Sequence, residues 1–336
     1  MERPDAMRVC IIGGTGNIST SIVRLLLAQG HDVTCFNRGR HGAAPDGANV
    51  IVGDRLERDR FETTMQQEAF DAAIDMICFN REDALSDIKA FQSVSHFIQV
   101  STVCTYGVEY DRLPVDEDHP LRPISDYGRN KVEADEAFLE AHRREGFPVG
   151  IVKPSTTYGP QLGLLRQIAW DFSWLKRVLE GRPIVICGDG HIIHQFLHVD
   201  DAALCFANML GREKCIGQTY NMVPEGFTSW RRYHETAMQV LGRKVEMVGV
   251  SCGDLALLEV PDSEVCRDIF AHNCYYSAAK LFQDVPEFKP RISLEEGMRR
   301  VFNSMQKQER IPASEPGGWE DRIIERVETM RTWRET

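Results

Sequence analysis

The stretch that most constrains the fold of this 336-residue chain is Val9–Ser19. It reads Val-Cys-Ile-Ile-Gly-Gly-Thr-Gly-Asn-Ile-Ser, so a run of apolar residues meets a cluster of glycines, and a helical pattern of apolar residues follows. A strand, a tight turn and a helix start fit the pyrophosphate of a dinucleotide. The glycines let the backbone come close, and free N–H groups at the helix N-terminus face the anion. Alone such a turn is a weak signal, so the rest of the chain must supply a matching fold and chemistry.

Apolar strand-like runs and helical segments alternate over the first 150 residues. We expect strands at 7–12, 32–36, 49–52, 72–77, 96–101 and 149–153, and helices at 17–29, 57–68, 81–92 and 126–145. Alternation at this spacing predicts an α/β fold with a Rossmann-type, doubly wound parallel sheet.

The regular alternation loosens after residue 160. We predict a nucleotide-binding Rossmann domain at 7–160, to which 188–211 returns, and a smaller, partly discontinuous α/β substrate lobe at 161–187 and 212–306. In this half we expect helices at 166–180, 200–210, 228–241, 276–283 and 293–306, and strands at 184–186 and 245–250. The tail at 307–336 is charged and poor in aliphatic residues, so we expect only a surface helix there.

Composition limits the classes of function. The net charge of -11 disfavours nucleic acid or an anionic membrane as a partner. No apolar run approaches the roughly 20 residues of a membrane-spanning helix, and the N-terminus lacks the apolar core of a signal peptide. The ten cysteines are scattered without a C-x-x-C pair, which favours a reducing compartment and argues against a disulfide framework or a metal site. We therefore expect a cytoplasmic protein without a bound metal.

Tyr127 and Lys131 stand four residues apart, on one face of the helix expected at 126–145. A phenol with a pKa near 10 is a poor acid or base at neutral pH, and a lysine one turn away lowers that pKa. Thr102, at the end of the fifth strand, can hydrogen-bond the same substrate oxygen. These three residues predict one site for proton transfer.

The end of the second strand bears on the choice of cofactor. The acidic residue that hydrogen-bonds the ribose of NAD is replaced by Asn37, and Arg38 and Arg40 follow. An arginine can bind a 2′-phosphate, which slightly favours NADP, but asparagine can also serve a 2′-hydroxyl, so NAD stays open. Asp54, at the end of the third strand, is a candidate acceptor for the adenine amino group.

The sequence resembles the extended short-chain dehydrogenase/reductase family, the NAD(P)-dependent sugar-nucleotide epimerases and dehydratases, with UDP-galactose 4-epimerase as the type most like it. Five segments carry the resemblance in family order: 13–18, 100–107, Tyr127-x-x-x-Lys131, Lys153–Pro160, and 188–201. The resemblance implies Thr102, Tyr127 and Lys131 as catalytic residues and a homodimer as the common assembly. It implies these cofactor-binding residues: Gly13, Thr15, Gly16, Asn17, Ile18, Asn37, Arg38, Asp54, Arg55, Met76, Lys131, Pro154, Ser155 and Thr156.

Several positions depart from the family pattern. Ser19 replaces the third glycine of the turn, where a small hydroxyl still fits with looser packing. Val103 and Cys104 stand where the 4,6-dehydratases carry an Asp-Glu pair, so that elimination chemistry is not expected. Cys104 is either a second base at the sugar, which requires a lowered pKa, or a small residue packed under the pocket.

On the substrate side, the resemblance implies Tyr106, His194 and Arg267 as candidate contacts. His194 stands where 4-epimerases have a phosphate-binding arginine, and Arg267 corresponds to a second one, so a nucleoside diphosphate on the substrate is left open. His198, Asp200 and Asp201 are interpreted as a structural turn that opens a helix with an aspartate as its N-cap, and not as a metal cluster.

The leading hypothesis is an NAD(P)-dependent epimerase that oxidises a sugar hydroxyl transiently and returns the hydride to the other face. The first alternative is a ketosugar reductase or dehydrogenase with exchangeable NADP(H), which Arg38 favours, and a Cys104-assisted variant of either reaction is also open. The third is a non-catalytic, RNA-associated member of the fold, against which the acidic charge and the intact Thr102, Tyr127 and Lys131 set speak.

Overall fold

The computed structural model describes residues 6–40, 42–258 and 260–335, and the chain divides into two compact units. Unit 1 consists of Met1–Thr157, Leu197–Glu225 and Tyr276–Arg291, and unit 2 consists of Tyr158–Phe196, Gly226–Tyr275 and Ile292–Thr336. The sequence suggested one return of the chain to the first unit, at 188–211. The structure has that return at Leu197–Glu225 and a second one, not anticipated, at Tyr276–Arg291.

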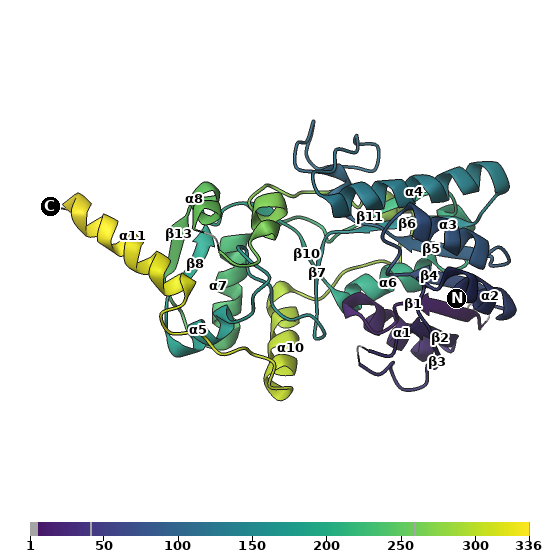
Figure 1. Cartoon of the computed structure of the whole chain (residues 1–336), viewed down its shortest axis with the longest axis horizontal. Coiled ribbons are helices and arrows are strands. Elements are labelled where there is room, and N and C mark those ends of the chain that lie inside the picture. The colour runs from purple at the N-terminus through teal and green to yellow at the C-terminus, as the bar shows by residue number, and fades with distance from the viewer. Residues whose placement is uncertain (1–5, 41, 259, 336) are drawn as a thin grey trace. The chain divides into compact units, whose positions relative to one another are not determined.

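Unit 1 is built on a parallel sheet (Figure 1) whose seven strands, counted over the described residues, run in the order β11-β6-β5-β4-β1-β2-β3. The strands are β1 (Arg8–Ile12), β2 (Asp32–Asn37), β3 (Asn49–Val52), β4 (Ala72–Asp75), β5 (His96–Val100), β6 (Val149–Pro154) and β11 (Thr219–Met222). The helices are α1 (Asn17–Gln29), α2 (Arg58–Gln67), α3 (Arg81–Ala90), η1 (Val103–Tyr106), α4 (Asp126–Glu145), α6 (Val199–Met209), η2 (Glu213–Cys215) and α9 (Ala279–Asp284). The predicted Rossmann-type doubly wound sheet is confirmed.

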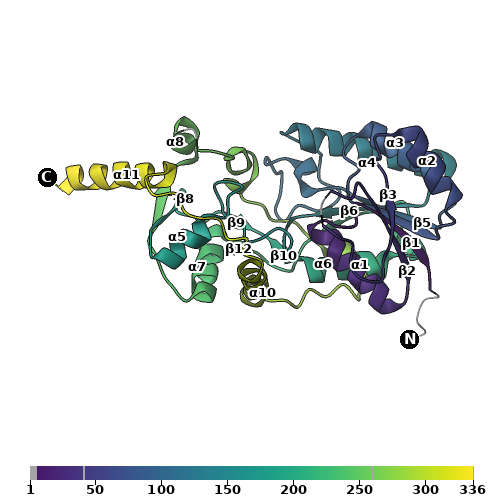
Figure 2. The same cartoon turned by 60° about the horizontal axis from the view of Figure 1, so that its bottom comes forward.

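Helices cover both faces of this sheet. Figure 2 shows α2, α3 and α4 along one face and α1 and α6 along the other. The central strands are apolar because they are buried on both sides, and β4 and β5 are buried along their whole length. A cluster of phenylalanines packs under α2, α3 and α4: Phe61, Phe70, Phe91, Phe97, Phe138 and Phe147. This rigid layer fixes the carboxyl edge of the sheet, where doubly wound folds bind their ligands.

Unit 2 is built from helices and two-stranded sheets. Its strands are β8 (Ile184–Cys187), β9 (Ile193–His194), β12 (Thr228–Ser229) and β13 (Met247–Val250), and its helices are α5 (Trp174–Glu180), α7 (Trp230–Leu241), α8 (Cys252–Leu257), the π-helix η3 (Cys266–Phe270), α10 (Leu294–Lys307) and α11 (Trp319–Glu335). Strands β7 (Thr156–Tyr158) and β10 (Phe196–His198) include the boundaries between the units. The helix expected at 166–180 begins only at Trp174, because the Arg166 side chain is used in buried ion pairs and the Asp171 carboxylate accepts the Ser173 N–H at 2.8 Å.

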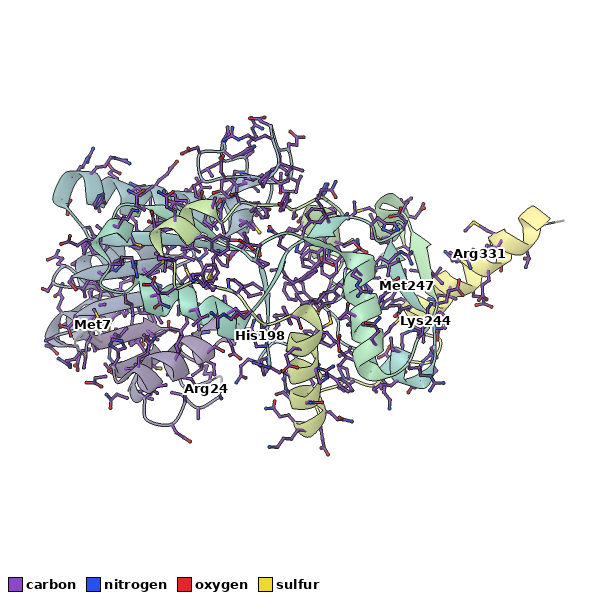
Figure 3. The ribbon with its side chains drawn as sticks, turned by 180° about the vertical axis from the view of Figure 1, so that it is seen from behind. Met7, Arg24, His198, Lys244, Met247 and Arg331 are labelled. Atoms are coloured by element: carbon purple, nitrogen blue, oxygen red, sulfur yellow. The ribbon has the colours of Figure 1, made fainter. Side chains whose placement is uncertain are left out.

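The tail is more than a surface helix, which corrects the sequence-based expectation. Glu320, in the first turn of α11, is 4% exposed and accepts hydrogen bonds from Arg166 at 2.7 and 3.0 Å. The same carboxylate accepts the Val185 N–H of β8 at 2.6 Å, and Ile323 and Ile324 are buried beside it. Further along, Arg331 pairs with Glu246 at 2.8 Å, and Figure 3 shows Arg331 beside the strand that carries Met247. The sequence did not indicate that α11 packs on unit 2, because the partners of its charged residues lie far away in sequence.

Within the described ranges, none of the helices has both the length and the apolar character that crossing a bilayer requires.

Candidate active site

The turn between β1 and α1 lies directly against β2. Gly13 has a positive φ of 83°, and its N–H donates to the Phe36 carbonyl at 2.9 Å. A Cβ on Gly14 would lie 2.4 Å from the Cys35 sulfur, which no side chain tolerates. The glycines are therefore needed for the close approach of the turn to the sheet as well as for its conformation.

The Ser19 side chain links the two ends of this turn through hydrogen bonds. Its hydroxyl accepts the Gly16 N–H at 2.8 Å and donates to the Gly13 carbonyl at 2.7 Å. The residue is completely buried. The serine that replaces the third glycine of the family therefore ties the two ends of the turn together, where the sequence suggested only looser packing.

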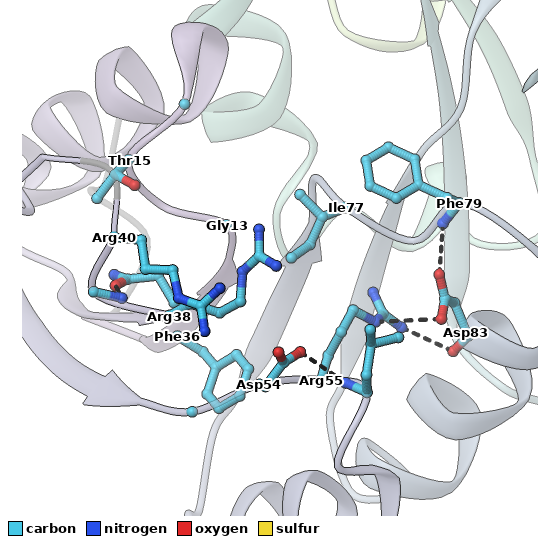
Figure 4. Close-up of a pocket in the computed structure, with 15 residues that line it drawn as sticks. Gly13, Thr15, Phe36, Arg38, Arg40, Asp54, Arg55, Ile77, Phe79 and Asp83 are labelled. Carbon is cyan, nitrogen blue, oxygen red and sulfur yellow. Dashed lines mark hydrogen bonds and ion pairs between the residues drawn. The ribbon is translucent and has the colours of Figure 1, made fainter.

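A cavity of about 370 Å³ opens at the carboxyl ends of β1, β2, β3 and β4 (Figure 4). Of the residues expected at the cofactor, it is lined by Gly13, Thr15, Gly16, Asn37, Arg38, Asp54 and Arg55, and it is also lined by Phe36, Gly39, Arg40, Gly53, Leu56, Ile77, Phe79 and Asp83. Asn17, Ile18, Met76 and the Pro154–Thr156 segment lie outside this lining. Asn17 and Ile18 begin α1, while the Met76 N–H donates to the Ile12 carbonyl at 3.0 Å.

Two arginines border the cavity on the β2 side. Figure 4 shows the Arg38 and Arg40 side chains lying together above the cavity. Over the described residues, neither guanidinium has a hydrogen bond or ion pair to protein. The Asn37 carboxamide faces its own loop and accepts the Gly39 N–H at 2.9 Å. This edge of the cavity thus offers two unpaired positive charges to an anion.

Asp54 and Arg55, at the end of β3, have local partners. The Asp54 carboxylate accepts the Leu56 N–H at 3.0 Å, which is the turn-forming interaction considered from the sequence. Arg55 is only 5% exposed, and its guanidinium binds the buried carboxylates of Asp75 and Asp87. Those carboxylates raise the pKa of Arg55, and both terminal nitrogens of its guanidinium are used in hydrogen bonds. Although Arg55 lines the cavity, its contacts therefore favour a role in joining β3, β4 and α3 over the expected role in binding the cofactor.

Thr102 and Tyr127 meet at the end of β5. Thr102 precedes η1 and its hydroxyl accepts the Cys104 N–H at 3.2 Å, while Tyr127 lies in the first turn of α4. Desolvation raises the pKa of the Tyr127 phenol to about 12, and the Thr102 side chain only partly opposes this. The sequence argument for a lowered pKa is therefore wrong for the protein by itself. The phenol is protonated at neutral pH, so it can donate a proton.

Lys131 is buried, and its ammonium points at backbone. It donates to the carbonyls of Cys78 at 2.7 Å and Val100 at 2.6 Å, which joins the ends of β4 and β5. Its Nζ lies 5.9 Å from the centre of the Tyr127 ring, and burial lowers the pKa of the amine.

Gly128 brings the start of α4 onto η1. A Cβ there would lie 2.8 Å from the Cys104 carbonyl oxygen and 3.0 Å from Cβ of Pro123. The Ser125 hydroxyl caps the helix by accepting the Gly128 N–H at 3.1 Å. This glycine therefore sets how closely Tyr127 approaches Thr102.

Cys104 lies beside Tyr127, but its environment does not activate it. Burial raises the pKa of the thiol, and the hydrogen bond with Thr102 only partly opposes this. A second base needs a depressed pKa, so the structure favours the interpretation of Cys104 as a packed residue.

Sequence reasoning missed a buried polar network under these residues. The Ser101 hydroxyl donates to Asp135 at 2.6 Å, and Lys153 lies 3.5 Å from the same carboxylate and donates to Thr105 at 2.9 Å. Asp135 follows Lys131 by one helical turn and faces the sheet. This spacing on α4 could have predicted that Asp135 is buried on the same face as Lys131. The network fixes β5, α4 and β6 relative to one another.

Tyr106 is fully buried in unit 1, and its hydroxyl donates to Asn221 at 2.9 Å. The ammonium of Lys153 lies 4.8 Å from the centre of its ring. The expectation that Tyr106 contacts a substrate therefore does not fit.

His194 and Arg267 belong to unit 2, and neither fits the expected phosphate contact. His194 is 2% exposed between Phe196, Trp230 and Phe270, and desolvation lowers its pKa to about 3. Arg267 is exposed and pairs with its neighbour Asp268 at 2.7 Å.

The His198–Asp201 turn has structural contacts. His198 caps α6 by accepting the Asp200 N–H at 3.2 Å, so the cap is the histidine and not an aspartate. Asp200 accepts the Ser21 hydroxyl at 2.8 Å, and Asp201 accepts the Arg291 N–H at 3.1 Å. These contacts join α6 to α1 and to the second returning segment.

The model of the NAD dependent epimerase/dehydratase family matches residues 9–80 and 83–222. The chain belongs to this family. It is accordingly an enzyme of the extended short-chain dehydrogenase/reductase type, as the ordered motifs indicated.

Two curated proteins illustrate how the family varies. The chain is similar to 2′-dehydrokanamycin reductase of Streptomyces kanamyceticus, with 28% identity over 288 residues, which is 85% of this chain and 81% of the reductase. It is also 29% identical over 237 residues to the chloroplast stem-loop binding protein of 41 kDa b of Arabidopsis thaliana, covering 66% of this chain and 60% of that protein.

Among solved structures, the fold is similar to a UDP-glucose 4-epimerase of Stenotrophomonas maltophila with bound NAD and formylated UDP-arabinopyranose. The TM-score is 0.75 at 18% identity, covering 91% of this chain and 100% of the epimerase. At this identity the likeness concerns the fold.

Proposed function

We propose that the chain is an NADP(H)-dependent oxidoreductase that interconverts a ketone and a secondary hydroxyl group on a sugar. The observation that carries the proposal is the cavity at the carboxyl ends of β1 to β4, where Arg38 and Arg40 are unpaired. When bound, the nicotinamide of the cofactor supplies or accepts the hydride.

The residues of this cavity fit a dinucleotide. The turn at Gly13 and Gly14 leaves no room for a Cβ, so the backbone itself borders the cavity at the start of α1. This is an arrangement that suits a pyrophosphate. Arg38 and Arg40 would hold a 2′-phosphate, and Asn37 adds no negative charge that would repel it.

Tyr127 supplies the proton chemistry in this proposal. With a pKa of about 12 the phenol is protonated at neutral pH, and it can therefore donate to the oxygen of a ketone. The Thr102 hydroxyl would hold the same oxygen. Lys131 fixes the strand ends through the Cys78 and Val100 carbonyls and keeps a positive charge close to the phenol.

The similarity to 2′-dehydrokanamycin reductase supports a net reduction as the reaction. The substrate lobe supports it too, because His194 is buried among aromatic rings and Arg267 is paired, so neither expected contact for a nucleoside diphosphate is present. A net redox reaction also needs an exchangeable cofactor, which suits NADP(H).

Epimerisation, the leading hypothesis from the sequence, is the second candidate. The family description and the 4-epimerase fold favour it, and the Thr102 and Tyr127 pair serves both directions of proton transfer. In that reaction the hydride returns to the sugar, so the cofactor is not consumed. The chloroplast stem-loop binding protein is a relative whose name indicates RNA binding. We do not propose RNA binding for this chain, because its net charge of -11 disfavours contact with phosphates.

The test of this proposal is Tyr127→Phe, assayed with NADPH and a panel of keto-sugars. Loss of the proton donor should lower kcat by about 10²–10⁴-fold while leaving the dissociation constant of NADPH unchanged. Tyr110→Phe is the matched control, since the Tyr110 hydroxyl bonds the Gly107 carbonyl and Tyr276 within unit 1. Full activity of Tyr127→Phe would show that another group moves the proton.

A further inference from the structure

Three cysteines far apart in sequence come together in unit 2. Cys187 ends β8, Cys252 begins α8 and Cys266 begins η3, and their sulfur atoms all lie within 4.8 Å of one another. The sequence suggested no metal site because no C-x-x-C pair exists. Here the fold, and not the spacing, gathers the ligands.

The backbone holds the three segments in place without any help from the sulfurs. Strands β8 and β13 pair in parallel with Val250 opposite Cys187, and Gly249 comes so close to the Gly188 carbonyl that a Cβ would lie 2.2 Å from its oxygen. The Gln167 side chain then links Cys187 to η3. It accepts the Cys187 N–H at 3.1 Å and donates to the Phe270 carbonyl at 3.3 Å.

One side of this cluster is open to a small molecule or ion. A cavity of about 320 Å³ is lined by Cys252 and Cys266, together with Val260, Ser263, Glu264 and Arg267. Cys187 and Cys266 are buried, whereas Cys252 is partly exposed. The cluster is therefore reachable from the cavity through Cys252.

The chemistry of the three thiols suits a soft cation. In a zinc site with metal–sulfur bonds near 2.3 Å, the sulfurs lie roughly 4 Å apart, a spacing that three sulfurs within 4.8 Å of one another reach with small side-chain movements. Thiolates select metals such as zinc and cadmium over magnesium or calcium.

We propose that Cys187, Cys252 and Cys266 form a site for one thiophilic divalent cation of the zinc type. Three thiolates bind the ion from the core side, and the fourth position faces the cavity, where water or a carboxylate completes the coordination. Binding releases the thiol protons and joins β8, α8 and η3 through one atom. The ion therefore stabilises unit 2, and this role is independent of the proposed oxidoreductase activity.

The experiment is a Cd²⁺ titration of the full chain after reduction and chelation, followed by the ultraviolet absorption of cadmium–thiolate bonds. We expect saturation at one equivalent, an absorption amplitude that corresponds to three thiolates, and a higher Tm in the loaded protein. Zn²⁺ should compete for the same site.

The decisive variant is Cys252→Ser, because this partly exposed residue can be replaced without opening the core. We expect the Cd²⁺ affinity to fall at least tenfold, while Cys274→Ser, a buried cysteine of the same unit outside the cluster, keeps it. Equal affinity in Cys252→Ser and the wild-type chain would overturn the proposal. The proposal would also be overturned by a reduced chain that takes up no cadmium but forms a disulfide within the cluster on mild oxidation. Two of the three thiols would then be a redox-active pair, and the third a neighbouring thiol without a role in metal binding.

Discussion

At the scale of single residues, the proposed preference for NADP rests on Arg38 and Arg40. Replacing Arg38 by alanine removes one of two cations from the cavity edge, and hydrogen bonds to charged groups contribute about 1.5–3 kcal/mol. We expect the dissociation constant of NADP⁺ to rise roughly 10–100-fold and that of NAD⁺ to change little, as measured by calorimetric titration.

Arg24→Ala is the matched control for this measurement. Arg24 is an exposed residue of α1 outside the cavity lining, so its loss changes the net charge of the unit equally. If Arg38→Ala weakened NADP⁺ and NAD⁺ by the same factor, the 2′-phosphate interpretation would be contradicted.

Several residue roles could not be predicted because they depend on partners distant in sequence. Arg55 lines the cavity as expected, but its guanidinium is held by Asp75 and Asp87 of neighbouring elements. Tyr106 stands after β5, where the family resemblance implied a substrate contact, yet its hydroxyl donates to Asn221, 115 positions later. The motifs gave the positions of these residues along the chain but not their contacts.

At the scale of elements, the contact between α4 and η1 controls the geometry of Tyr127. Gly128→Ala introduces a Cβ that meets backbone, which costs about 1–3 kcal/mol in strain, while alanine favours the helix by about 1 kcal/mol. We expect a net loss of about 0–2 kcal/mol in the free energy of unfolding, whereas kcat falls about tenfold because α4 moves away from Thr102.

The neighbouring substitution Asn130→Ala gives the same helix preference on the exposed face of α4 and should leave kcat unchanged. Thermal unfolding and steady-state rates of both variants separate the effects. A Gly128→Ala enzyme with wild-type kcat would show that the close approach of α4 is not needed.

Elements with a strong hydrophobic period were predicted well, and polar ones were not. The expected strand at 49–52 and the helices at 17–29 and 126–145 agree with β3, α1 and α4. The seventh strand of the sheet, β11, was missed because Thr-Tyr-Asn-Met is only four residues long and lacks the continuous apolar run that is typical of a strand buried on both faces. The burial of the start of α11 was missed because a charged residue such as Glu320 is typical of an exposed helix. Its ion pairs with Arg166 and Arg177 become apparent only in the folded chain.

At the scale of the whole molecule, buried histidines make the fold sensitive to acid. Desolvation lowers the pKa of His96 to about 4 and those of His194 and His234 to about 3. Each is neutral in the folded chain, and in the unfolded chain each binds a proton below about pH 6.5. Their stabilising contribution is therefore complete above pH 6.5 and is lost as the pH falls towards the folded values.

We expect the free energy of unfolding to fall on acidification by about 1.4 kcal/mol per pH unit for each histidine, measured by urea unfolding between pH 7 and 5. His96→Asn keeps an acceptor for the Gly211 N–H and should reduce this pH dependence by about one third. A free energy that does not change between pH 7 and 5 would contradict the account.

The central claim is a net, NADP(H)-dependent redox reaction on a sugar. The most direct measurement is the change in nicotinamide absorbance when the wild-type enzyme meets NADPH and a panel of keto-sugars, with the products counted. The account predicts one NADPH oxidised for each hydroxyl formed and no turnover of UDP-sugars without a cofactor change. Inversion of a UDP-sugar with no net oxidation of the nucleotide would contradict it and establish the epimerase instead.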